Sequence, residues 1–181
     1  MGTEVLCAVN ADNIGACQKL LLEQVEGLWR KASTGAAEID VLPRKLYSQD
    51  SFSPNTAAIY VSMMFFRARE NVRFETLTTG YSMVLVDDNV VIGLAKSESQ
   101  DDNLRQSSSP VSFKNEGWHR IALIVANASA MDCGGGVFYS RGDNNVWERF
   151  ESSKNGKDFS VDRLKARRVL KDIERAKQIT R

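Results

Sequence analysis

The chain has 181 residues, of which 43% are hydrophobic and 26% are charged, and its formal net charge at pH 7 is +1. This composition is ordinary for a globular protein, and the length allows a sizeable hydrophobic core within one domain. The nearly balanced charge argues against electrostatic steering of partners by the body as a whole. We therefore expect residues 1–181 to form a single domain.

The sequence carries no targeting or membrane signal that we can identify. Its first residues lack the basic and apolar segments of a secretory signal peptide, and its longest apolar run is too short to span a bilayer. The cysteines, Cys7, Cys17 and Cys133, are odd in number and widely spaced, which predicts no disulfide framework. With His119 as the single histidine and no CxxC pair, the sequence predicts no metal site and implies no cofactor. We expect a cytoplasmic or other intracellular protein without a transmembrane segment.

The first predicted element is an amphipathic helix over residues 12–34. Apolar side chains recur every three or four residues from Ile14 to Ala32, which places them on one face of a helix. Asn13 is a favourable N-cap residue, and Gly35 is a natural stop.

A strand-rich body follows over residues 57–150. Its first segment is apolar at nearly every position, which is typical of a central strand buried on both faces. A tight turn at residues 87–89 indicates a hairpin, and residues 96–117 read as a long loop. The strands are predicted at residues 57–66, 72–77, 81–86, 90–95, 118–126, 137–139 and 146–150.

The last segment, residues 160–181, holds eight basic and three acidic residues, a local net charge of +5 on a chain whose total is +1. Its apolar residues, from Ala166 to Ile179, are spaced to form one stripe, which predicts an amphipathic helix over residues 160–180. The fold class expected from this order is α+β: a mainly antiparallel sheet, sandwich or flattened barrel with an amphipathic helix at each end.

A basic helix on a mildly acidic body favours a polyanionic partner. Arginine grips phosphate with a bidentate fork, and aromatic side chains on nearby strands can stack on bases. Our first hypothesis is a non-enzymatic binding or structural protein that contacts nucleic acid, RNA above all. A self-associating viral coat, matrix or movement protein is one setting for such a chain. The expected contact residues are Arg163, Lys165, Arg167, Arg168, Lys171, Arg175, Arg141, Arg149 and Trp147.

Two alternatives stay open. The amphipathic helices and the long loop also suit a protein–protein interaction module, which would act as a homo-oligomer or with a partner protein. The other alternative is a cysteine hydrolase that uses Cys17 and His119. A thiol early on a helix and a histidine later on a strand is an order that resembles papain-like cysteine peptidases, although the residues around Cys17 lack that family's cysteine box.

Residues 132–136, Asp-Cys-Gly-Gly-Gly, resemble the nucleophile stretch of chymotrypsin-like viral cysteine peptidases. In that family the glycine amides form an oxyanion hole. The pattern departs here because His119 lies only fourteen residues before Cys133, whereas that fold needs its histidine far upstream. A glycine-rich turn between two strands is the competing interpretation.

Overall fold

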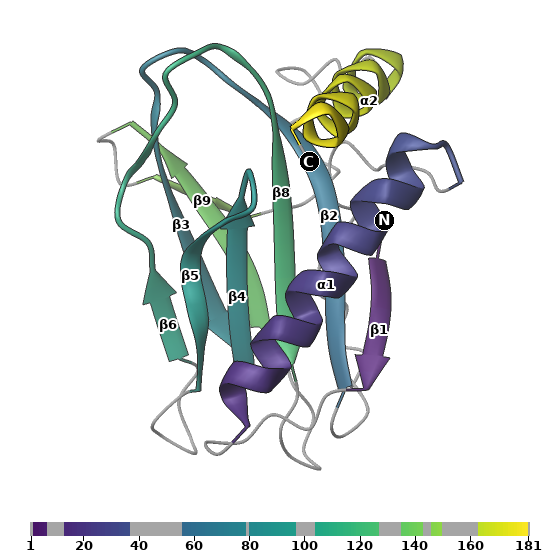
Figure 1. Cartoon of the computed structure of the whole chain (residues 1–181). Helices are drawn as coiled ribbons and strands as arrows, with labels where there is room; N and C mark the ends of the chain where they lie inside the picture. Colours follow the sequence, from purple (N-terminus) through teal and green to yellow (C-terminus); the bar gives the residue numbers. More distant parts are fainter. Residues whose placement is uncertain are drawn as a thin grey trace.

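The structure is a computed structural model, and it describes residues 2–6, 13–36, 56–78, 80–96, 104–126, 135–142, 146–149 and 163–180. Two helices and two antiparallel sheets make up these residues (Figure 1). In chain order the elements are β1 (Gly2–Leu6), α1 (Ile14–Ser33), β2 (Thr56–Phe66), β3 (Asn71–Thr78), β4 (Tyr81–Val86), β5 (Asn89–Lys96), β6 (Leu104–Ser107), β7 (Val111–Ser112), β8 (Gly117–Ala126), β9 (Gly135–Arg141), β10 (Trp147–Arg149) and α2 (Arg163–Ile179). The expected α+β class with a sheet sandwich is confirmed.

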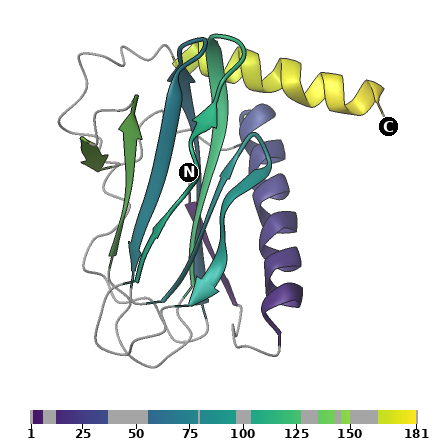
Figure 2. The same cartoon turned by 90° about the vertical axis from the view of Figure 1, so that its left-hand side faces the viewer.

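The first sheet has the strand order β1-β2-β8-β4-β5, and the second has the order β10-β9-β3-β6, with β7 also pairing with β3. All of these pairings are antiparallel. Both helices lie on one face of the first sheet, and the second sheet lies on its other face (Figure 2). The molecule therefore has three layers in these parts: helices, first sheet, second sheet.

The first sheet separates two hydrophobic clusters. Alternate residues of β8 point to opposite faces, so Ile124 packs toward the helices with Trp29, while Leu123 packs between the sheets with Phe74. All four side chains are essentially inaccessible to solvent, and each contributes about 1.5–3 kcal/mol by burial. Burial on both faces explains why β2, β4 and β8 read as continuous apolar runs.

The helix boundaries agree closely with those expected from the sequence. The first helix was expected over residues 12–34 and is found at Ile14–Ser33, followed by Gly35 in the left-handed region at φ +79°. The C-terminal helix was expected over residues 160–180 and is found at Arg163–Ile179. The hairpin at residues 87–89 is also confirmed, although its turn is tighter, because Asn89 already belongs to β5.

The prediction that residues 96–117 form a loop is wrong for part of that segment. β6 and β7 lie within it, and both pair with β3. Neither shows a usable sequence period, because β6 is mostly polar and β7 has only two residues. The first strand, β1, was also missed, and it pairs along the edge of β2. Residues 97–103 lie outside the described part of the chain.

Candidate functional site

The helix α2 carries four of its basic side chains on the face turned away from the body. Ala166 and Leu170 are fully buried on the opposite face, where they join the cluster shared with α1 and the first sheet. The end of α2 extends past α1 (Figure 2). Four basic side chains of the outward face are exposed to solvent: Lys165, Arg168, Lys171 and Arg175.

These four positions recur at intervals of three or four residues, so they are neighbours along one side of the helix. Two acidic residues lie among the described residues of α2, and their side chains point in different directions. Asp172 lies among the exposed cations, with its Oδ1 3.8 Å from Nη1 of Arg175, an open contact between two exposed side chains that is worth little. Glu174 is turned inward, toward Arg120. We call the four exposed cations the basic face of α2.

Two other contacts were predicted on α2. Arg167 is half-buried, and the side chain of Arg163 lies outside the described residues. Lys177, which was not among the predicted contacts, binds the body of the protein: its Nζ lies 2.6 Å from Oδ2 of Asp88 on the β4–β5 turn.

A charged cluster beneath α2 joins the helices to the sandwich. Its centre is Arg120 on the central strand β8. The side chain of Arg120 is only 5% exposed although it is charged. The guanidinium contacts the carboxylate of Asp88, and its Nη1 lies 3.6 Å from Oε1 of Glu174. Its Cζ also lies 5.7 Å from the ring centre of Trp29 on α1, within cation–π range. Arg120 therefore contacts the turn, α1 and α2 at once.

Asp87 fixes the same turn to β8. Its backbone N–H donates to the carbonyl of Arg120 at 2.9 Å, and its Oδ1 accepts the backbone N–H of Arg120 at 2.9 Å. Its Oδ2 lies 2.6 Å from Nδ1 of His119. Burial alone raises the pKa of Asp87, but the hydrogen bonds from His119 and Arg120 and their charges outweigh it, so the pKa is lowered. Asp87 and Asp88 both have positive φ, 47° and 68°, which suits a tight hairpin turn.

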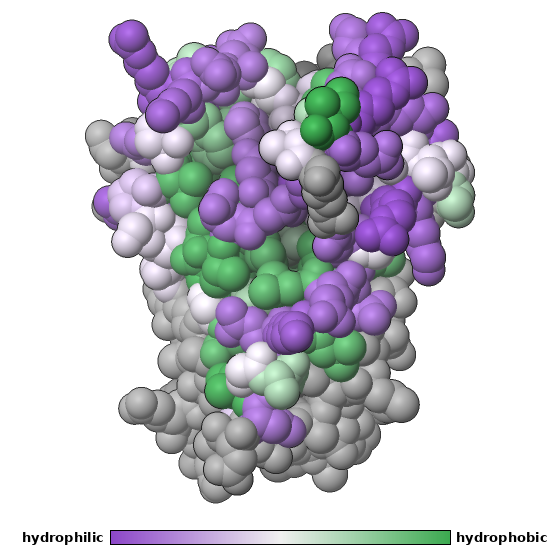
Figure 3. Space-filling view, in the orientation of Figure 1, coloured by the Kyte–Doolittle hydropathy of each residue, from purple (hydrophilic) through white to green (hydrophobic). Residues whose placement is uncertain are grey.

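A cleft of about 760 Å³ opens between α1, α2 and this turn. Apolar surface gathers around a hollow on the face of the molecule that carries α1 (Figure 3). The residues that line the cleft are Leu22, Val25, Glu26, Leu85, Asp88, Ile173, Ala176, Lys177 and Thr180. The cleft is thus mainly apolar, with the Lys177–Asp88 ion pair in its wall.

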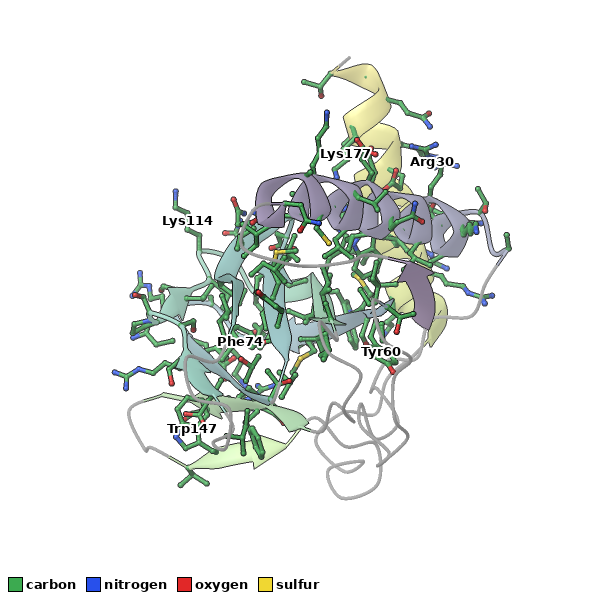
Figure 4. All side chains as sticks on the ribbon, turned by 90° about the horizontal axis from the view of Figure 1, so that it is seen from below. Arg30, Tyr60, Phe74, Lys114, Trp147 and Lys177 are labelled. Atoms are coloured by element: carbon green, nitrogen blue, oxygen red, sulfur yellow. The ribbon has the colours of Figure 1, made fainter. Side chains whose placement is uncertain are left out.

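Arg141 on β9 and Trp147 on β10, which pairs with β9, lie far from the basic face of α2. Trp147 and Lys177 appear at opposite sides of the molecule when it is seen from below (Figure 4). Arg141 is on β9 of the second sheet, with its Nη1 3.1 Å from Oε1 of Glu70 and its Cζ 5.4 Å from the ring centre of Phe66. The structure therefore does not bring Arg141 and Trp147 together with α2. The side chain of Arg149 lies outside the described residues.

Cys17 and His119 are also kept apart. Cys17 is 5% exposed in the cluster on the helix side of the first sheet, and it is disulfide-bonded, whereas the sequence predicted no disulfide framework. Cysteine number and spacing carry no information on which sulfurs meet in space. His119 points to the other side of that sheet, with its ring centre 4.4 Å from that of Phe113. The two side chains form no nucleophile–base pair. Cys7 and Cys133 lie outside the described residues.

Among the described residues, no three His, Cys, Asp or Glu side chains gather in a way that would hold a metal ion. Within the same residues, neither helix combines the length and the apolar character needed to cross a membrane.

No protein-family model matches the sequence, and no curated protein matches it. Solved structures are similar over part of the chain. The PA14 domain of the antifreeze protein MpAFP has a TM-score of 0.46 and 10% identity, over 53% of this chain and 48% of that domain's chain. A PA14 sugar-binding domain from an RTX adhesin has a TM-score of 0.44 and 8% identity, over 52% and 50%. An anti-sigma factor domain-containing protein from Clostridium clariflavum has a TM-score of 0.44 and 10% identity, over 56% and 33%. This chain spans half or less of the length of these three, and such partial likeness carries no information on ligands.

Proposed function

We propose that the protein binds nucleic acid, RNA in particular, through the basic face of α2. The observation that supports this most directly is the exposure of Lys165, Arg168, Lys171 and Arg175 along one side of a single docked helix. From residue 165 to residue 175 the helix rises about 15 Å, enough for a row of contacts to successive phosphates.

The chemistry of these side chains suits phosphate. Two of the four are arginines, whose planar guanidinium can donate two parallel hydrogen bonds to one phosphate group. Their exposure means that binding requires no side chain to leave the core, and the opposite face of the helix keeps its apolar contacts with the body. The protein would then act as a binding protein whose affinity depends mainly on charge and therefore on salt.

The test is a fluorescence-anisotropy titration of labelled single-stranded RNA with the full chain and a charge-reversal pair. Arg168→Glu combined with Lys171→Glu removes two adjacent cations of the basic face. The matched control combines Lys19→Glu with Lys114→Glu, two exposed lysines that lie on α1 and after β7. Both doubles change the net charge from +1 to −3.

We expect the α2 double to bind RNA at least about tenfold more weakly than the wild type, because two contacts are lost and two repulsions are gained. The control should stay within about threefold of the wild type. Equal losses in both doubles would mean that total charge matters and the helix face does not. Unchanged binding in the α2 double would refute the proposal.

A further inference from the structure

The cleft between α1, α2 and the β4–β5 turn is distinct from the basic face of α2. Its lining residues on α2 include Ile173, Ala176 and Lys177, which occupy a different side of the helix from Arg168 and Arg175. The cleft can therefore hold a ligand whether or not the basic face binds RNA.

The size and lining of the cleft favour a small ligand with an apolar body. Its volume of about 760 Å³ lies within the range of roughly 300–1,000 Å³ that is usual for small-molecule sites. Three elements contribute its apolar wall, with the side chains of Leu22, Val25, Leu85, Ile173 and Ala176. An apolar chain placed there would exchange water for hydrocarbon contacts, at about 25 cal/mol for each Å² removed from solvent.

The charges at the cleft favour an anionic head group. The carboxylate of Asp88 is shared by two cations, the buried Arg120 and the partly exposed Lys177. Lys177 lines the cleft and its side chain is 38% exposed, so its ammonium can turn to a ligand anion. Asp88 would keep Arg120 as its partner in that exchange, and no carboxylate would be left without a cation. A cationic head group would instead meet two acids that already have cation partners: Asp88, which contacts Arg120 and Lys177, and Glu26, whose Oε1 lies 3.8 Å from Nη2 of Arg30.

We propose that this cleft binds an anionic amphiphile of the fatty-acid type. The alkyl chain lies between α1 and α2, against Leu22 and Ile173. The carboxylate of the ligand accepts hydrogen bonds from Nζ of Lys177.

Isothermal titration calorimetry of the full chain with decanoate, below its micellar concentration, tests the proposal. Decyltrimethylammonium, with the same chain length and the opposite charge, is the comparison ligand. Decanoate should bind measurably and about fivefold more tightly than the cation, the upper end of what one partly exposed ion pair contributes. Shortening the chain to octanoate should weaken binding about fourfold for each methylene lost. No binding of decanoate, or equal binding of both amphiphiles, would overturn the proposal.

Two variants locate the ligand. Lys177→Gln should weaken decanoate binding about fivefold, whereas Lys31→Gln, an exposed lysine on α1 that does not line the cleft, should not change it. Ala176→Trp keeps Lys177 and places a large ring in the cleft from an exposed helical position, so it should abolish binding without unfolding the chain. Circular dichroism confirms that each variant is folded. Decanoate binding that survives Ala176→Trp in a folded protein would place the ligand elsewhere and refute the assignment.

Discussion

Replacement of Arg120 by methionine tests whether the charged cluster beneath α2 holds the helices on the sandwich. The side chain of Arg120 is 5% exposed, and the carboxylate partners Asp88 and Glu174 have side chains that are 41% and 19% exposed. Removing one partner of a buried ion pair costs about 3–5 kcal/mol, because the remaining charge stays buried and unpaired. Here the acids keep some contact with water and Asp88 keeps Lys177. We therefore expect Arg120→Met to lower the free energy of unfolding by about 3 kcal/mol, the lower end of that range.

The assay is urea unfolding of the wild type, Arg120→Met, Glu174→Gln and the double variant. Because Glu174→Gln removes the charge that Arg120 neutralises, Arg120→Met should cost at least about 1 kcal/mol less in that background. A loss below about 1 kcal/mol for the single variant would refute the reasoning. So would an equal loss in both backgrounds, since it would mean that Arg120 and Glu174 are not coupled.

Two further predictions concern Asp87 and Cys17. The lowered pKa of Asp87 means that the stability its carboxylate contributes is present above the ordinary pKa of about 4 and is lost as the pH falls through the lowered value. Asp87→Asn should therefore destabilise the protein more at pH 7 than at about pH 2 in urea unfolding, and an equal loss at both pH values would contradict the assigned contacts. Because Cys17 is disulfide-bonded, a reductant should lower the free energy of unfolding by about 3 kcal/mol, and a thiol reagent should not label Cys17 in the native, unreduced protein. Rapid labelling at neutral pH would contradict that bond.

The elements that could be predicted from the sequence are those with a strong period or an unbroken apolar run. The helices over residues 14–33 and 163–179 bury one stripe each, and the strands over residues 56–66 and 117–126 are buried on both faces, so each leaves a clear pattern. β6 and β7 leave no such pattern, because β6 is mostly polar and β7 has only two residues; both are placed by pairing with β3.

The composition of the candidate site was predicted better than its geometry. A count of charges was enough to select α2, but the sequence does not say which sheet each strand joins. β2 and β3 are joined by a short turn and yet belong to different sheets. β9 and β10, which carry Arg141 and Trp147, join β3 in the second sheet, so they lie in the layer away from α2. Arg120 was missed, although a charged residue in an otherwise apolar strand was an available signal. Its partners Asp88 and Glu174 are remote in sequence and meet it only through the fold.

The most direct test of RNA binding by α2 is the salt dependence of the affinity. With four phosphate contacts to a single strand, the slope of log K against log salt should be about −2.8, so affinity should fall about 50-fold between roughly 50 and 200 mM salt. The Arg168→Glu/Lys171→Glu double should have a slope of half that size or less, because at most two contacts remain. Affinity that does not change with salt, or a slope that is the same in the wild type and the double, would contradict the account.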